Sequence, residues 1–330
     1  MRRIHLFFLL PALLAPFAQA DSISLPASDS TTSSPLPQAS GFSGSPAPQP
    51  SSPGTLAQAT HTLPLESRVP GGIALLPLPA DAPEGTQVWF GKQRVWVLAQ
   101  PDGSRVAVVG IPLGARGHID VHLLADGKDS TVTIPLTAKA YKEQHLTVSQ
   151  EFVTPDPKQL ERYAREAAEQ AAIYKAFHAT NGGWPAFRMP VVGVINPTSF
   201  GSVRFFNGEP RAPHSGMDIA APDGREVTAP ADGVVVQTGE YFFNGNTVLI
   251  DHGNGLVSML CHLSKIIARP GQHVKAGDLV GLVGHTGRVT ASHLHWGVSL
   301  NDARVNPVLV LPEGSEPAAP ADSAQSLPLQ

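Results

Sequence analysis

The chain has 330 residues, which is enough for about two domains and additional segments. Its formal net charge is −4 and no cluster of Lys and Arg stands out, which argues against a nucleic-acid partner. Charged residues make up 15% of the chain, against about 25% in typical soluble proteins, and 31 Gly and 32 Pro favour many turns over a helical protein.

Residues 1–20 have the pattern of a cleavable secretory signal peptide. Arg2 and Arg3 precede a short apolar run (residues 6–17) that ends in Ala-Gln-Ala (residues 18–20). Two prolines interrupt the run, which is also too short for a comfortable membrane span. We therefore expect an exported protein with no integral membrane segment after signal cleavage.

Two further segments are predicted to be disordered. Residues 21–62 consist mainly of Ser, Pro, Ala and Thr, and they lack the apolar clusters that could offset the entropy lost on ordering. We interpret them as a flexible tether, and residues 312–330, with a similar composition, as a disordered tail.

Residues 63–150 predict a small N-terminal domain that resembles a β-sandwich. Short β-prone runs alternate there with Gly-containing turn signals, and the fold class of the whole chain is expected to be mainly β. The runs are Val88–Phe90, Arg94–Leu98, Arg105–Val109, His118–His122 and Thr131–Ile134. His118 and His122 share one face of a strand, and we interpret that face as a solvent side and not as a metal site.

A connecting helix is predicted within residues 151–185. Strong helix formers fill Lys158 to about Phe177, Asp156 is a suitable N-cap, and Pro157 suits the first helical position. The sequence Asn-Gly-Gly at 181–183 is expected to end the helix.

Residues 186–311 again predict short strands with frequent glycine, and most of the chemistry lies here. Seven of the 13 histidines fall between His214 and His295. His293 and His295 point to one face of a strand, since side chains alternate with period 2. His214 and Asp218 would do the same if the segment between them is extended.

Two histidines and one carboxylate are the ligands of an open catalytic zinc site. The residues alone leave one alternative open, because both rings of the His-x-His pair, His293 and His295, could bind the metal. A histidine that lies nearby without binding the metal could accept a proton from water or stabilise an intermediate.

The motifs, taken in order, resemble those of the lysostaphin/LytM-type zinc endopeptidases. The resemblance rests on His214-x-x-x-Asp218, the pair His262-Leu263, the Gly-His-Thr-Gly sequence at 284–287, and His293-x-His295. It covers roughly residues 190–311 and implies an antiparallel β peptidase domain with a zinc groove. The order of domains is similar to exported Gram-negative members that carry a small β domain before the peptidase.

The resemblance also implies roles for individual residues. It makes His214, Asp218 and His295 the Zn²⁺ ligands, and His262 and His293 the pair that activates water and stabilises the intermediate. The implied substrate is the peptide cross-link of peptidoglycan, cut between D-Ala and meso-diaminopimelate, and the implied location is the periplasm. Leu260 departs from the family pattern, because members often carry an aromatic residue two positions before the central histidine.

Two other classes of function remain as alternatives. A non-catalytic regulator with the LytM fold would be expected to have lost zinc ligands, whereas every ligand is present here. Residues 270–281 also resemble the hairpin of lipoyl- or biotinyl-carrier domains, but the turn at 243–246 lacks the lysine that a carrier needs.

Several other polar residues have no assigned catalytic role. Cys261, the only cysteine, excludes an internal disulfide and is expected to be buried, pointing away from its neighbour His262. Arg204 and Arg288 either bind substrate carboxylates or have structural roles. The remaining histidines of this region are interpreted as surface or packed residues: His252, His273 and His285.

Overall fold

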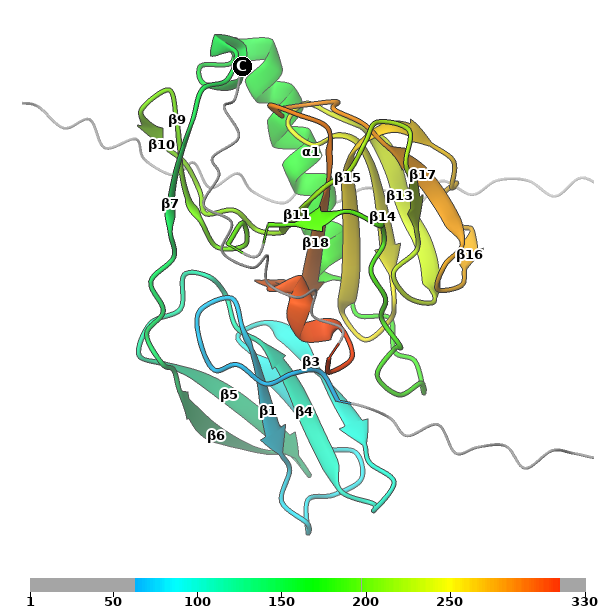
Figure 1. Cartoon of the computed structure of the whole chain (residues 1–330). Helices are drawn as coiled ribbons and strands as arrows, with labels where there is room; N and C mark the ends of the chain where they lie inside the picture. The colour runs from blue at the N-terminus through cyan, green and yellow to red at the C-terminus, as the bar shows by residue number, and fades with distance from the viewer. Residues whose placement is uncertain (1–62, 197, 315–330) are drawn as a thin grey trace, which may run out of the picture. The chain divides into compact units, whose positions relative to one another are not determined.

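The structure, a computed structural model, describes residues 63–196 and 198–314 (Figure 1). The predicted signal peptide and tether, and most of the predicted tail, lie outside the described residues. No helix in the part of the chain that the structure describes is long and apolar enough to cross a membrane.

The first strands form a six-stranded antiparallel sheet in the order β1-β4-β3-β2-β5-β6. Tight turns connect neighbouring strands, as at Asp126-Gly127, where both residues have positive φ. The strands are β1 (Ile73–Pro77), β2 (Gln87–Phe90), β3 (Gln93–Ala99), β4 (Arg105–Gly110), β5 (His118–Ala125) and β6 (Lys128–Pro135).

The two halves of this sheet share one buried core. Ala107 and Val109 from β4 pack in the same cluster as Val121 from β5 and Ile134 from β6. Outward residues of β5 and β6 are exposed, which explains the alternating pattern of these strands. The prediction of a mainly β chain with a small N-terminal β domain is therefore confirmed, and the domain is an antiparallel sheet.

A small sheet that the sequence did not predict follows. Strand β7 (Glu143–Leu146) runs parallel to β9 (Val203–Phe206), which forms a hairpin with β10 (Glu209–Pro210). A 3-10 helix, η1 (Gln150–Phe152), leads from β7 toward the long helix.

Helix α1 (Pro157–Lys175) starts as predicted, with a capping box between Asp156 and Gln159 and proline at its first position. The prediction that Asn-Gly-Gly at 181–183 ends the helix was wrong. The helix stops at Lys175, and Ala176 is already extended. In the following segment, Asn254 bonds the backbone and side chain of Thr180.

The remaining strands form a largely antiparallel 10-stranded sheet whose main path is β16-β13-β14-β15-β18-β11-β8. Helix α1 packs against β13 and β15 of this sheet (Figure 1). The strands are β8 (Val194–Ile195), β11 (Met217–Ala220), β12 (Glu226–Thr228), β13 (Gly233–Tyr241), β14 (Gly245–Asp251), β15 (Leu256–Ile266), β16 (His273–Val274), β17 (Leu279–Val283), β18 (His293–Leu300) and β19 (Ala303–Val305), and a 3-10 helix η2 (Pro307–Val310) follows them.

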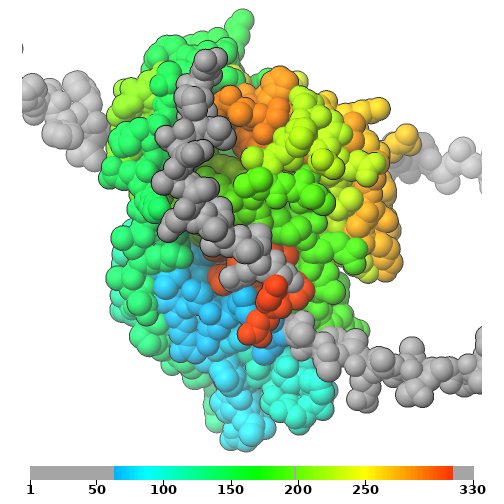
Figure 2. Space-filling view, in the orientation of Figure 1, coloured from blue at the N-terminus to red at the C-terminus, as the bar shows by residue number. Residues whose placement is uncertain are grey.

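One apolar cluster continues from the N-terminal sheet into the C-terminal one. Trp96 from β3 packs beside Trp184 with ring centroids 5.4 Å apart, and both belong to the cluster that includes Trp296 of β18. The last described residues also bond back to the first ones, since the Leu65 amide donates to the Leu309 carbonyl. Figure 2 shows the red residues near the end of the described chain beside the blue residues near its start.

Candidate metal centre and groove

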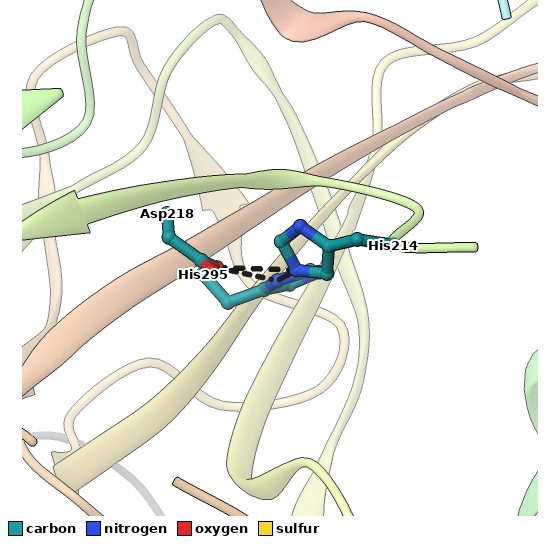
Figure 3. A group of neighbouring side chains, drawn as sticks. All are labelled: His214, Asp218 and His295. Carbon is teal, nitrogen blue, oxygen red and sulfur yellow. Dashed lines mark hydrogen bonds and ion pairs between the residues drawn. The ribbon is translucent and has the colours of Figure 1, made fainter. Parts of the chain in front are cut away.

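His214, Asp218 and His295 converge on one point (Figure 3). Nε2 of His214 lies 2.8 Å from Nδ1 of His295. Oδ1 of Asp218 lies 3.2 Å from the first nitrogen and 3.1 Å from the second. Both histidines are buried and Asp218 is mostly buried, so the centre is shielded from bulk water.

Strand pairing places two of these residues side by side. Asp218 of β11 lies directly opposite His295 of β18 in the antiparallel register, so their side chains share one face of the sheet. Gly216, just before β11, lets the chain approach closely: a Cβ there would lie 2.5 Å from the ring of His295.

The prediction that His214 and Asp218 point to one face of an extended segment is only partly correct. The two side chains meet, but the segment between them is not one extended strand, because β11 begins at Met217. Residues four apart on a strand are separated by about 13 Å along its axis, which is too far for a shared ligand. The chain instead bends at Ser215-Gly216, and that bend brings His214 over the strand.

The proton positions of His214 and Asp218 suit a cation between them. Nδ1 of His214 lies 2.8 Å from the carbonyl of Ser199, which can only accept, so Nδ1 carries the proton and Nε2 presents a lone pair. Burial lowers the pKa of His214 to about 4, despite the nearby Asp218. Burial alone would raise the pKa of Asp218, but the charges and hydrogen bonds of His214 and His295 hold it well below its usual range.

Arg204 holds the other oxygen of the carboxylate. Its Nη2 donates to Oδ2 of Asp218 at 2.7 Å, while its Nε donates to Oε1 of Gln144 at 3.0 Å. Strands β7 and β9 therefore connect to the centre through one guanidinium. Of the two roles considered for Arg204, binding a substrate carboxylate or a structural role, the second applies, because its guanidinium already pairs with Asp218.

His262 and His293 flank the three converging residues. The ring centroids of His262 and His293 are 4.9 Å apart, and His262 lies 5.9 Å from His295. Nδ1 of His262 faces the carbonyl of Thr286 at 2.9 Å, and Nδ1 of His293 faces that of Ala291 at 2.8 Å. Each Nδ1 therefore carries a proton, and in the neutral ring the lone pair lies on Nε2.

Of the two rings in the His-x-His pair, the structure groups His295 with the potential metal ligands. Nε2 of His293 comes within 3.6 Å of Oδ1 of Asp218 but stays outside the set whose ligand atoms all lie within 4.8 Å of one another. The geometry thus favours one ring of the pair over a site that uses both.

The position of His262 depends on an irregular backbone. Its φ is 64°, in the left-handed region, and the pairing of β14 with β15 shifts register just beside it. Burial, together with the charges of His295 and His293, lowers its pKa well below the ordinary value, so the ring is neutral at neutral pH.

The structure also corrects the prediction that Cys261 points away from His262. The residue is fully buried, as predicted, and burial raises the pKa of its thiol to about 12. It does not point away from the histidines, however: Cys261 pairs directly with His295, so both occupy the same face. His262 reaches that face as well because its left-handed backbone breaks the alternation.

A groove of three neighbouring cavities passes over this centre. One of about 170 Å³ adjoins His214 and His295, one of about 190 Å³ adjoins Asp218 and His293, and one of about 300 Å³ follows helix α1. No described residue before 186 lines the cavity beside His214 and His295. Strand β7 forms part of the wall of the cavity beside Asp218 and His293, and helix α1 forms part of the wall of the third.

Sequence reasoning missed these walls. Ser199, whose carbonyl orients His214, gives no sequence signal because any residue could supply a carbonyl. Gln144 in β7 and Gln170 in α1 line the groove from segments interpreted as part of the first domain and as a connector. Their approach depends on packing between segments far apart in the chain.

The histidines interpreted as surface or packed residues lie away from the centre. His118 and His122 are on the exposed side of β5. His285 is exposed and lies 2.8 Å from Asp223, and His273 is exposed in β16. His252 is buried between the carbonyl of Asp232 and the hydroxyl of Ser258. Leu260 is fully buried in the core and does not line the groove.

The donor set fits a small divalent cation. A tetrahedral Zn²⁺ with ligands at about 2.0–2.1 Å separates its ligand atoms by about 3.3 Å. The corresponding separations in this centre are 2.8, 3.1 and 3.2 Å, close to that value. Two imidazole nitrogens and one carboxylate oxygen also match the ligand preference of zinc.

Family models match both parts of the chain. Residues 212–307 match the model of peptidase family M23, and residues 66–139 match that of the M23 N-terminal domain. A crystal structure of a putative peptidase M23 from Pseudomonas aeruginosa has 37% sequence identity and a TM-score of 0.61. The match covers 75% of this chain and 96% of that one.

Curated relatives match over a shorter segment. The peptidoglycan DD-endopeptidase ShyA of Vibrio cholerae is 46% identical over 95 residues, and the DD-carboxypeptidase/endopeptidase Mpg of Neisseria meningitidis is 44% identical over 97. Each match covers 29% of this chain and 22% of the relative, so the chain aligns with about a fifth of their length.

Proposed function

Because the chain belongs to peptidase family M23, the lysostaphin/LytM family, we propose that it is a zinc endopeptidase that hydrolyses peptide cross-links of peptidoglycan. The scissile bond in this proposal joins D-Ala to meso-diaminopimelate. The observation that carries it is the convergence of His214, Asp218 and His295 at 2.8–3.2 Å beside two further histidines. The activities in the names of the relatives ShyA and Mpg support the same class of substrate.

His214 through Nε2, His295 through Nδ1 and Asp218 through Oδ1 would hold the metal. When bound, Zn²⁺ supplies a Lewis acid that polarises the scissile carbonyl and lowers the pKa of water. Arg204 keeps Oδ2 of Asp218 engaged, so the carboxylate presents one oxygen to the centre and the other to the guanidinium.

We assign the proton transfers to His262 and His293. Nδ1 of each ring donates to a backbone carbonyl, so each ring is oriented and each Nε2 can accept a proton from the attacking water. Nε2 can then return the proton to the leaving amine, or donate to the oxygen of the tetrahedral intermediate. The low pKa of His262 keeps this ring in the base form before attack.

We also propose a periplasmic location. It is supported by the basic and apolar pattern of residues 1–20 and by the cell-wall substrates in the names of the two relatives. Fractionation of cells that produce the full-length protein tests it, because a protein retained in the cytoplasm with its first 20 residues attached would refute the export proposal.

The test of activity is digestion of purified cross-linked muropeptides, with and without a zinc chelator. Cleavage that depends on metal, and that is lost in His295→Ala, is expected. Full activity in the chelated sample or in His295→Ala would contradict the mechanism. A zinc-loaded protein that binds peptidoglycan without cutting it would instead support the non-catalytic regulator.

A further inference from the structure

Arg288 is clamped in the groove between two aromatic rings. Its guanidinium carbon lies 4.5 Å from the ring centroid of Phe206 and 4.2 Å from that of Phe243. Its backbone amide donates to the carbonyl of Phe243 at 2.9 Å. The two rings come from β9 and from the β13–β14 turn, so two separate parts of the chain hold the guanidinium.

Within residues 63–196 and 198–314, the guanidinium of Arg288 makes no hydrogen bond or ion pair with another residue. The neighbouring arginines differ: Arg204 pairs with Asp218, and Arg211 donates to the carbonyl of Val153. Burial, followed by the charges of Arg204 and Arg211, lowers the pKa of Arg288 to about 10, so it remains a cation at neutral pH. A partly desolvated cation without a counter-ion is costly until an anion pairs with it.

The location of Arg288 makes it available to a substrate. Arg288 lines all three cavities: the one beside His214 and His295, the one beside Asp218 and His293, and the one along α1. A substrate bound over the metal centre therefore passes the guanidinium of Arg288, whichever way its chain runs along the groove.

The proposed substrate carries an anion close to the reacting bond. In a cross-link between D-Ala and meso-diaminopimelate, the carbon attached to the scissile nitrogen also bears a free carboxylate. A glycine bridge, or a cross-link whose diaminopimelate is amidated, has no negative charge there. Arg is the side chain best suited to pair with a carboxylate through two parallel hydrogen bonds.

We infer that Arg288 binds the free carboxylate next to the scissile amide, and that this pair selects carboxylate-bearing cross-links over amidated or glycine ones. The inference rests on the proposed function. Phe206 and Phe243 hold the guanidinium in place before the substrate arrives, so little side-chain entropy is lost on binding.

The test uses the zinc-loaded protein and two purified cross-linked dimers that differ only at this group, one a carboxylate and the other a carboxamide. The wild type is expected to cut the carboxylate dimer with a kcat/KM about 10-fold to 100-fold higher, mainly through a lower KM, since charged hydrogen bonds contribute about 1.5–3 kcal/mol. Arg288→Gln should bring the ratio of the two kcat/KM values close to one, and Arg288→Lys should restore part of it.

Arg211→Gln is the matched control, because it removes the same charge nearby and should keep the wild-type ratio. Bound zinc and the melting temperature of each variant show whether its centre and fold are intact. The two-dimer comparison in the wild type needs no variant, so equal cutting would overturn the inference even if Arg288→Gln fails to fold, and Arg288→Lys then tests whether the preference depends on Arg288.

A wild type that cuts both dimers equally, or an Arg288→Gln that lowers both rates by the same factor, overturns the inference while the endopeptidase proposal stands. A zinc-loaded wild type that cuts neither dimer overturns the proposed function, and the inference with it.

Discussion

Arg204 and Asp218 form an ion pair of 2.7 Å that uses only one oxygen of the carboxylate. The other oxygen faces His214 and His295 at 3.2 and 3.1 Å. The guanidinium therefore fixes the rotation of the carboxylate and favours binding of the metal through a single oxygen. Its own Nε bonds Gln144 of β7, so the orientation of a metal ligand depends on the small sheet that β7, β9 and β10 form.

Replacement of Arg204 should weaken metal binding without removing a ligand. Arg204→Ala is expected to lower zinc affinity about 10-fold to 100-fold, the usual effect of losing a partner that orients a ligand. Arg204→Lys should recover part of the affinity, because an ammonium can still reach one oxygen. Titration against a competing chelator measures the effect, with Arg211→Ala as a control of equal charge; equal affinities for all four proteins would contradict the positioning role.

The two outer histidines should separate catalysis from metal binding. His262→Gln and His293→Gln are each expected to lower kcat about 10²-fold to 10⁴-fold, the range for loss of a general acid–base group. Both should retain bound zinc, in contrast to His295→Ala. Metal analysis and steady-state cleavage of a muropeptide dimer give the two readouts.

His285→Gln provides the matched control for these variants. His285 is exposed, lies 2.8 Å from Asp223 and does not line the cavities over the centre, so its replacement should leave both readouts unchanged. Loss of zinc in His293→Gln would show that both rings of the His-x-His pair bind the metal, contrary to the geometry.

The sequence predicted the residues of the centre better than their arrangement. His293 and His295 follow from the period of a strand, and the order of the motifs identified His214, Asp218 and His262. The convergence of His214 with Asp218 depends on a bend at Ser215-Gly216, and that of His262 on a left-handed backbone. Neither irregularity can be predicted from the alternation of side chains along a strand, because that rule assumes a regular strand.

The walls of the groove could not be predicted, for a different reason. Strand β7 is short and polar, and it pairs with β9 across a long stretch of chain, so no local pattern indicates it. Helix α1 was predicted from its composition and cap, but its packing against β13 and β15 is a tertiary property. Local rules determine elements, whereas the groove is formed by contacts between them.

His252 should make the fold sensitive to mild acid. Its ring is buried and neutral, with Nδ1 donating to the carbonyl of Asp232 and Nε2 facing the hydroxyl of Ser258. Burial lowers its folded-state pKa to about 4, below the unfolded value of 6.5. The unfolded chain thus binds more protons between these two values, so the free energy of unfolding should fall as the pH drops from about 6.5 to about 4, by at most about 3 kcal/mol from this group.

Urea unfolding of the metal-free protein at several pH values, for the wild type and His252→Gln, checks this expectation. His214 and His262 titrate in the same direction but are present in both proteins, so the difference in slope isolates His252. The variant should lose less stability on acidification, whatever its stability at neutral pH. Parallel pH profiles would show that His252 does not titrate in this range.

Asn301 should stabilise the junction between the two β-rich parts. Its side-chain oxygen accepts from the Gly110 amide at 2.8 Å and its amide nitrogen donates to the Gly110 carbonyl at 3.2 Å, in a buried site. Asn301→Asp keeps the acceptor but replaces the donor with an oxygen that faces the carbonyl. The expected loss is about 1–3 kcal/mol in the free energy of unfolding, because a buried polar group is left without a partner.

Asp302→Asn is the matched control, because it replaces a carboxylate with an amide at the next position. Asp302 also has positive φ, and it contacts Arg304 instead of Gly110, so its replacement should change stability by less than about 0.5 kcal/mol. Chemical unfolding of the wild type and both variants, monitored by tryptophan fluorescence, measures the difference, since Trp96 and Trp184 meet at the same junction. If Asn301→Asp were as stable as Asp302→Asn, the two hydrogen bonds to Gly110 would add nothing to the stability of the junction, which would then depend on apolar packing alone.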